Sequence, residues 1–197
     1  VLHYVKDTQK ARLSHIDHLK YYDLGGSLVL DSSTVRNLEL VESLFDGTRH
    51  ATLISCLDRT STGMGARLLR SWLLRPEIDL NEIQLRLDVI TELKGKLIER
   101  EEIKKLLQKV YDVERLLSKV TLSTANGRDL VALRQSLEQI PFLKTRLGLF
   151  TTRRLQELNH LADPLEDVAE LIGKALTDNP PILLTEGGLI REGYHSE

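Results

Sequence analysis

The sequence of 197 residues contains one cysteine, and only 5% of its residues are aromatic. A single thiol excludes an intrachain disulfide and a zinc site built from several cysteines. Free cysteines are usually buried, so we predict that Cys56 is a small apolar residue of the core. Because aromatic side chains are scarce while 41% of the residues are hydrophobic, we expect an aliphatic, leucine-based core.

Long hydrophobic runs and an excess of positive charge are also absent. No apolar run approaches the roughly 18 residues that a membrane-spanning helix requires, so no membrane partner is expected. The chain opens Val1-Leu2-His3-Tyr4, without an initiator methionine or the regions of a secretory leader. We therefore expect an intracellular, cytoplasmic piece of a longer polypeptide. The net charge of -2 argues against a globally basic nucleic-acid binder.

Motifs that carry chemistry are missing as well. A P-loop needs Gly-Lys followed by Ser or Thr, and neither Gly95-Lys96-Leu97 nor Gly173-Lys174-Ala175 meets that requirement. The glycines of Thr62-Gly63-Met64-Gly65 favour close packing or a tight cap over phosphate binding. His15 and His18 share a helix face without a third metal ligand nearby, so we interpret them as surface or capping residues. No catalytic residue, metal or cofactor is expected in this chain.

Apolar residues recur at helical spacing along most of the chain. Asp79 and Glu82 form a potential capping box before the first of three stripes. The stripes are Leu80, Ile83, Leu87 and Ile90; Leu106, Val110, Val113, Leu117 and Val120; and Leu130, Leu133, Leu137 and Ile140. This pattern predicts an all-α fold, a multi-helix bundle with at most one or two short strands. We expect its apolar stripes to suffice for a core that folds alone.

Turn and capping residues mark the expected helix boundaries. Asn126-Gly127 separates two helices, and Pro141 bends or ends the second. Asp163-Pro164-Leu165-Glu166 predicts the start of a last helix, with an acidic N-cap and proline at the first helical position. That helix is expected to run to about Thr177. Short apolar runs at 25–31 and 182–190 are compatible with strands, although such runs are ambiguous.

The most informative segment is 58–76, DRTSTGMGARLLRSWLLRP. It predicts a loop that caps an amphipathic helix, which ends before the proline. Trp72 lies at helical spacing from Leu68 and Gly65, so we predict that its ring anchors the core.

Basic residues gather in the segment 94–109, and a second small basic cluster consists of Arg146, Arg153 and Arg154. Interleaved glutamates favour a solvated face with local ion pairs. Contact with phosphates is the alternative for both groups of residues.

Several segments, taken in order, resemble the core domain of the MutS family of DNA mismatch-repair proteins. They are 31–40 DSSTVRNLEL, 58–76 as given above, 111–117 YDVERLL, 125–130 ANGRDL and 186–194 EGGLIREGY. Gly63 stands where the family more often has alanine. The resemblance covers almost the whole chain. It implies that residues 1–197 are a MutS-like core (lever) domain, in which 186–197 lead toward a clamp domain that lies outside them.

The resemblance also implies a parent protein that encircles mismatched duplex DNA as a homodimer or heterodimer and uses ATP and Mg²⁺ at a remote ATPase. Such a parent works with mismatch-repair partner proteins and is associated with the bacterial nucleoid. The family's mismatch-reading Phe-x-Glu and its Walker motif do not occur in this sequence. The chain is therefore expected to act as a rigid connector between DNA-binding modules and the ATPase.

Candidate residues follow from that role. Glycine placement suggests hinges, and the family-like segments suggest structural anchors: the hinges are Gly25, Gly26, Gly187 and Gly188, and the anchors are Trp72, Arg59 and Asn37. Two other functions remain open. A general helical scaffold or adaptor that binds protein partners explains the periodicity equally well, whereas a stand-alone enzyme requires a convergent polar pocket.

Overall fold

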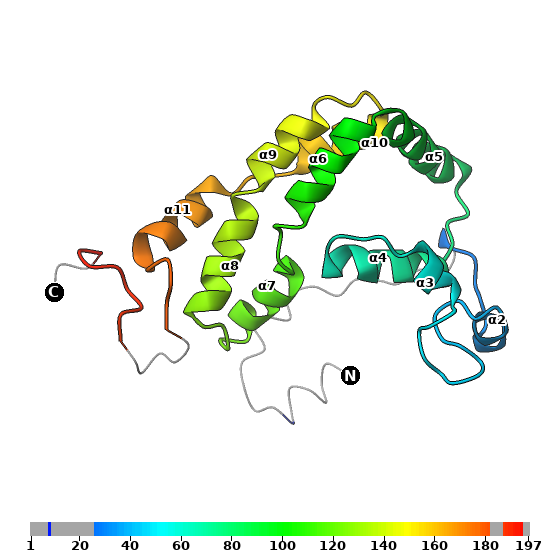
Figure 1. Cartoon of the computed structure of the whole chain (residues 1–197), viewed down its shortest axis with the longest axis horizontal. Helices are drawn as coiled ribbons and strands as arrows, with labels where there is room; N and C mark the ends of the chain where they lie inside the picture. The colour runs from blue at the N-terminus through cyan, green and yellow to red at the C-terminus, as the bar shows by residue number, and fades with distance from the viewer. Residues whose placement is uncertain (1–7, 9–25, 182–186, 195–197) are drawn as a thin grey trace.

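The computed structural model describes residues 8, 26–181 and 187–194 of the chain (Figure 1). The helices are α2 (Ser32–Asn37), α3 (Leu53–Leu57), α4 (Gly63–Leu74), α5 (Leu80–Gly95), α6 (Leu97–Leu107), α7 (Val113–Thr121), α8 (Gly127–Leu137), α9 (Ile140–Leu147), α10 (Arg153–Leu161) and α11 (Glu166–Ala175). Within these residues extended pairing is limited to two isolated antiparallel bridges, Ser27–Glu77 and Leu176–Ile190. The predicted all-α fold class is confirmed. In the same ranges, no helix has both the length and the apolar character needed to cross a membrane.

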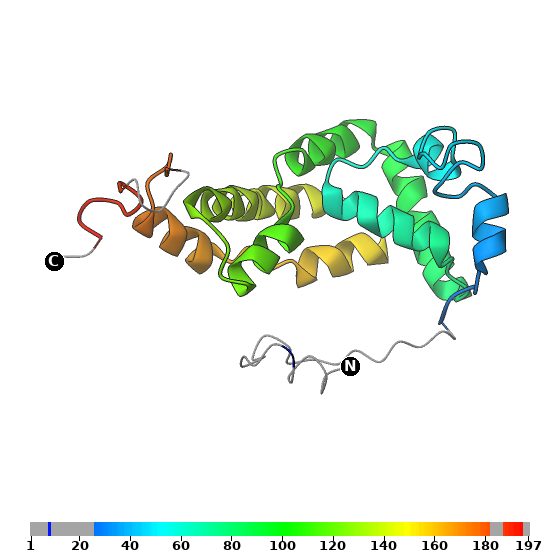
Figure 2. The ribbon, with the colours of Figure 1, turned by 90° about the horizontal axis from the view of Figure 1, so that it is seen from below.

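The helices form an arch with α11, α8 and α7 toward one end and α5 and α10 toward the other (Figure 1). Helix α4 lies beneath the arch and continues toward α3 and α2, and Figure 2 shows the same elements from below. Many large apolar side chains of the described residues are exposed, for example Leu80 at 79% and Ile98 at 74%. Much of the apolar surface therefore lies outside any core.

Most of the buried apolar residues among those described form two aliphatic clusters, while Val131, Leu143, Phe150 and Leu155 are buried outside them. One cluster lies between α7, α8 and α11 and consists of Leu116, Leu133, Leu137, Ile172 and Leu176. The other consists of Leu40, Val41 and Ile54, against which Leu73 and Leu74 of α4 pack. The leucine-based composition is as predicted, but of the three predicted stripes only the last contributes buried cluster residues, Leu133 and Leu137.

Helix α4 forms as the segment 58–76 predicts. The Thr62 hydroxyl accepts a hydrogen bond of 3.0 Å from Gly65 N and so caps the helix, which ends before Pro76. A Cβ added at Gly63 would lie 2.8 Å from Asp112 Oδ2. Glycine at this position thus allows α4 to approach the start of α7, which confirms the close-packing interpretation.

The predictions that Trp72 and Cys56 are buried are wrong. Helical spacing correctly puts Trp72 on one face with Leu68, but that face borders an open groove between α4, α5 and α10. The indole is 43% exposed and stacks on Arg86, whose guanidinium carbon lies 4.3 Å from the ring centroid. Cys56 is exposed on the short helix α3, whereas Ile54 of the same helix is buried.

Two predicted boundaries are also wrong. The apolar stripe from Leu106 to Val120 is interrupted at 108–112, because Asp112 caps a new helix by accepting from Arg115 N. Helix α11 begins at Glu166, not at the proline. Asp163 accepts from Leu165 N in a local turn, and Leu165 adopts φ +49° as the residue before the helix.

Of the other helix caps predicted from the sequence, one forms as expected and one forms only in part. Asn126 and Asp129 form a reciprocal capping box at the start of α8, so the predicted separation of two helices at 126–127 is confirmed. Asp79 caps α5 by accepting from Asn81 N, but no capping box with Glu82 forms there. The Glu82 carboxylate instead pairs with Arg154 of α10.

Glu92 of α5 caps α10 from a distance in sequence. Its carboxylate accepts hydrogen bonds from Thr151 N at 2.8 Å, Thr152 N at 2.9 Å and Lys96 Nζ at 3.0 Å. Burial works to raise the pKa of Glu92, but these donors outweigh it and hold the pKa at about 2. The start of α10 therefore depends on an ionised carboxylate from a neighbouring helix.

Phe150, between α9 and α10, is 1% exposed, and we expect Phe150→Ala to reduce the free energy of unfolding by about 3–5 kcal/mol. Trp72→Ala should cost clearly less, because that ring is only partly buried. Urea unfolding of both variants measures the difference. An equal or larger loss for Trp72→Ala would contradict the division into buried and open apolar faces.

The Glu92 carboxylate should make the fold acid-sensitive. Its pKa is depressed from its usual 4.5 to about 2, so the stabilisation is complete above pH 4.5 and is lost as pH falls toward about 2. Glu92→Gln should therefore lower stability at neutral pH and flatten its dependence on pH across that window. Thermal unfolding from pH 7 to pH 2 tests this, with Glu101→Gln on the surface of α6 as the control. Parallel curves for wild type and Glu92→Gln would rule the cap out.

Candidate functional site at the helix junctions

Two polar junctions connect the parts of the arch. The first, the α4–α7 junction, is centred on Arg67 of α4. Its Nη1 and Nη2 donate to Asp112 Oδ2 and Oδ1, each at 2.7 Å, and its Nε donates to Glu114 Oε2 at 3.0 Å. This bidentate geometry fixes distance and orientation together. The Arg67 guanidinium holds the pKa of Asp112 at about 2, so the pair stays charged at neutral pH.

Asp112 is also the N-cap of α7, because its Oδ1 accepts a hydrogen bond from Arg115 N. One carboxylate thus caps α7 and receives the arginine of α4. The buried hydroxyl of Ser136 secures the same linker from α8 by accepting from Tyr111 N at 2.9 Å and donating to Ala132 O at 2.8 Å. A shift of α4 relative to α8 therefore has to disturb the start of α7.

The second junction, the α8–α11 junction, is centred on Asp178. Its Oδ1 accepts from Arg134 Nη2 of α8 at 3.0 Å and from Arg191 Nη2 at 3.2 Å. These two arginines lower the pKa of Asp178, with the hydrogen bond from Arg134 as the largest contribution. Arg134 is only 14% exposed in its side chain, so its charge depends on Asp178 and Glu138 for compensation.

Backbone hydrogen bonds attach residues 189–191 to the end of α11. Thr177 N donates to Leu189 O at 3.1 Å, and Arg191 N donates to Ala175 O at 2.9 Å. The Arg191 side chain adds a bond from Nε to Leu176 O at 3.2 Å. Of the run 182–190 that the sequence suggested as a strand, residues 182–186 lie outside the described residues. Residues 189–191 form a strap that runs antiparallel to residues 175–177 at the end of α11.

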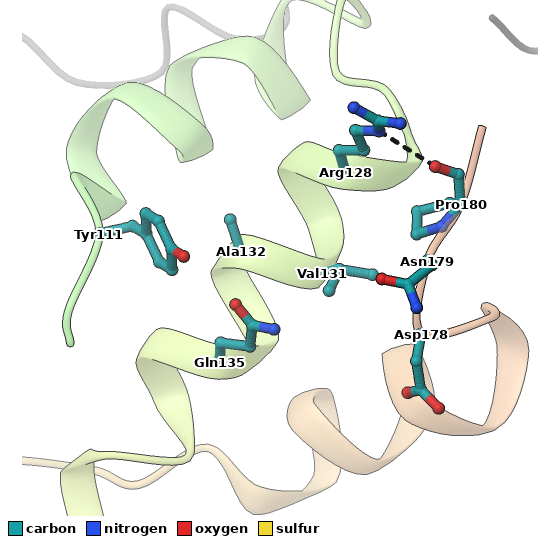
Figure 3. A pocket seen from close by; sticks show the side chains of 8 residues that line it. All are labelled: Tyr111, Arg128, Val131, Ala132, Gln135, Asp178, Asn179 and Pro180. Carbon is teal, nitrogen blue, oxygen red and sulfur yellow. Dashed lines mark hydrogen bonds between the residues drawn. The ribbon is translucent and has the colours of Figure 1, made fainter. Parts of the chain in front are cut away.

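A shallow pocket of about 460 Å³ lies beside the second junction, between α8 and residues 178–180. Figure 3 shows its lining of Tyr111, Arg128, Val131, Ala132, Gln135, Asp178, Asn179 and Pro180. The dashed line is the hydrogen bond of 3.1 Å from Arg128 Nε to Pro180 O. The lining lacks a nucleophile paired with a base, and the described residues contain no group of three His, Cys, Asp or Glu placed to hold a metal. Its chemistry is that of hydrogen bonds that hold segments together.

The glycines proposed as hinges lie at chain reversals or next to bridges. Gly187 and Gly188 have φ of +73° and +69°, values that side chains rarely adopt. They turn the chain just before residues 189–191 attach to α11. Gly26 precedes the Ser27–Glu77 bridge, while Gly25 lies outside the described residues, as do His15 and His18. These turns meet a geometric need, and the hinge role stays a prediction.

The proposed anchors Arg59 and Asn37 are both exposed. Arg59 Nη1 donates to the adjacent Asp58 O at 3.1 Å. In that loop it is Asp58 that organises the chain. The hydroxyl and amide of Thr60, together with Arg49, hold the pKa of Asp58 at about 2. The arginine that connects helices is Arg67, eight residues further on.

The interleaved charges give ion pairs for only part of the basic segment 94–109, where Lys96 and Arg100 are paired, whereas each arginine of the second basic cluster has an acidic partner. Lys96 pairs with Glu92, Arg146 with Glu102 and Arg154 with Glu157. The junction residues Arg67, Asp112, Arg134 and Asp178 were missed by sequence reasoning. The cap position of Asp112 was the one available signal, since Arg67 lies 45 residues from Asp112 and Arg134 lies 44 residues from Asp178.

Comparisons with known proteins agree with the family motifs in the sequence. A family model described as MutS domain III matches residues 33–197. The chain is 50% identical to the DNA mismatch repair protein MutS of Solibacter usitatus and 46% identical to that of Symbiobacterium thermophilum, in each case over 100% of the chain. It is 44% identical to that of Ruminiclostridium cellulolyticum. The chain spans 22–23% of the length of these relatives.

Asp178→Asn should loosen the strap, because it removes the charge that Arg134 and Arg191 share. We expect faster amide hydrogen exchange at Thr177 and Arg191, whose bonds attach the strap to α11. Glu170→Gln is the matched control, since Glu170 pairs only with Lys174 on the exposed face of the same helix. Unchanged exchange at both amides in Asp178→Asn would show that the backbone bonds hold the strap without the ion pairs.

Proposed function

Because this chain belongs to the MutS domain III family, we propose that it is the connector, or lever, of a DNA mismatch-repair sensor. In this role it couples a DNA clamp and a mismatch-binding module to a remote ATPase. It transmits the relative position of its helices and carries out no reaction of its own.

The observation that carries this proposal is the bidentate pairing of Arg67 with Asp112. It joins α4, which packs on one buried cluster, to α7, which belongs to the other. Packed clusters move as bodies because close-packed interiors deform little. A pairing of fixed geometry between two such bodies passes a displacement of one to the other.

The strap at 189–191 supports the same role. It is attached to α11 by backbone bonds and to α8 through Asp178, at the end of the chain that leads, by family resemblance, toward a clamp. A pull on the strap acts on both helices of the cluster around Leu133 and Ile172. We infer that this is where motion enters or leaves the domain.

The remaining activities are proposed for the whole protein, because this chain spans only 21–23% of the length of its relatives. They comprise binding of mismatched duplex DNA, use of ATP and Mg²⁺, assembly as a homodimer or heterodimer, and contact with mismatch-repair partner proteins. None of these activities requires a catalytic group from the connector.

A helical adaptor that binds protein partners is the second candidate. The open groove between α4, α5 and α10 favours it, because Leu68, Trp72, Ile90 and Leu158 leave much of their side chains exposed there. The two candidates differ in what Arg67 does. In an adaptor Arg67 contributes only to the stability of the fold, whereas in a connector it also couples the DNA-binding modules to the ATPase.

Arg67→Lys in the full-length protein tests the connector role, because lysine keeps the charge but loses the paired geometry. Affinity for mismatched duplex should stay within about twofold, while stimulation of the ATPase by the mismatch should fall at least about fivefold, the lower end of typical coupling energies. Fluorescence anisotropy and steady-state ATPase assays measure the two quantities.

Arg153→Lys is the matched control, since Arg153 is mostly exposed and pairs only with Glu157 of its own helix. Thermal unfolding of both variants excludes a general loss of structure. If Arg67→Lys retained full stimulation in a folded protein, the connector role of this junction would have to be given up in favour of the adaptor.

A further inference from the structure

A second surface, away from both junctions, combines positive charge with exposed apolar area. Helices α6 and α9 lie side by side (Figure 1) and form a hollow of about 340 Å³. We call it the α6–α9 hollow. Its lining includes Glu102, Lys105, Leu106, Lys109, Phe142 and Arg146.

The charges at the hollow are only partly compensated. Arg146 Nη1 lies 3.0 Å from Glu102 Oε2, so these two neutralise each other. Lys105 and Lys109 have no ion-pair partner among the described residues, and both are exposed. The rim is therefore positive on a chain whose net charge is -2. The dipole of α6 favours Lys105 in its last turn, but Lys109 lies beyond the helix end and gains little from it.

Phe142 gives the hollow an apolar wall. Its side chain is 59% exposed, and it stands in the first turn of α9 directly after Pro141. Leu106 of α6 lines the same hollow. A positive rim around an aromatic and an aliphatic side chain matches the anatomy of a protein-binding hot spot, in which an apolar anchor is surrounded by polar contacts.

We propose that the α6–α9 hollow binds an acidic segment of a partner protein. One apolar side chain of that segment enters beside Phe142 and Leu106, while its carboxylates face Lys105 and Lys109. Duplex DNA is the less suitable occupant, because contacts with phosphates use lysines but leave Phe142 and Leu106 exposed. Aliphatic Leu106 and the concave shape also favour a side chain over a stacked base.

The probe is a fluorescent peptide in which aspartates flank a Leu-Phe pair, titrated against the full-length protein. Two matched peptides replace Leu-Phe by Ser-Ser or the aspartates by lysines. We expect the acidic Leu-Phe peptide to bind at least about tenfold more tightly than either, a difference of about 1.4 kcal/mol.

Protein variants locate the binding. The double substitution Lys105→Glu and Lys109→Glu should weaken binding of the acidic peptide at least about tenfold, since the attraction between opposite charges becomes repulsion. Phe142→Ala should lower the affinity for the Leu-Phe peptide but leave the affinity for the Ser-Ser peptide unchanged. Lys174→Glu is the control, because Lys174 is an exposed lysine on α11. Should Phe142→Ala fail to fold, the lysine variant alone decides, as both its side chains lie on the surface.

Three outcomes would overturn the proposal. One is equal binding of the three peptides, and another is undiminished binding by the double lysine variant. The third is the absence of peptide binding together with duplex or single-stranded DNA binding that the same variants reduce. That last result would assign the hollow to nucleic acid.

Discussion

The carboxylate of Asp112 ties α4, which lies beneath the arch, to α7 at one end of the arch (Figure 1). It caps α7 and at the same time receives both terminal nitrogens of Arg67 from α4. Because most of the buried apolar residues form two small clusters, hydrophobic burial alone does not define how the clusters are oriented. A directional, charge-assisted pairing supplies that orientation.

The same principle recurs along the chain. Glu92 caps α10 from α5, Ser136 secures the linker before α7 from α8, and Asp178 joins α8 to the strap. In each case a polar side chain of one element satisfies the backbone or the charge of another. Burial stabilises the helices, while these contacts fix their relative positions. A domain that transmits motion has to keep such positions defined, and the polar contacts do so without a large continuous core.

Sequence reasoning recovered what depends on neighbours in the chain. The helical spacing of Leu80 to Ile90 and the capping loop before α4 were correct, since each rests on interactions within about one turn. Trp72 was misplaced because periodicity gives the face of a helix but not what covers that face, and Cys56 because the general tendency of free cysteines to be buried does not describe a particular position. Helical spacing also continued across the break at 108–112, where Asp112 starts a new helix. The partners of Arg67 and Asp178 lie in other helices and were out of reach of any local pattern.

The exposure of the α4–α7 junction has a consequence for its stiffness in solution. The side chain of Arg67 is 40% exposed and that of Glu114 is 66% exposed, so mobile ions reach both. At physiological ionic strength the Debye length is about 8 Å, and added salt shortens it. Contacts between leucines are not screened in this way. Rising ionic strength therefore weakens the ion pairs of the α4–α7 junction before it affects the two apolar clusters that this junction connects.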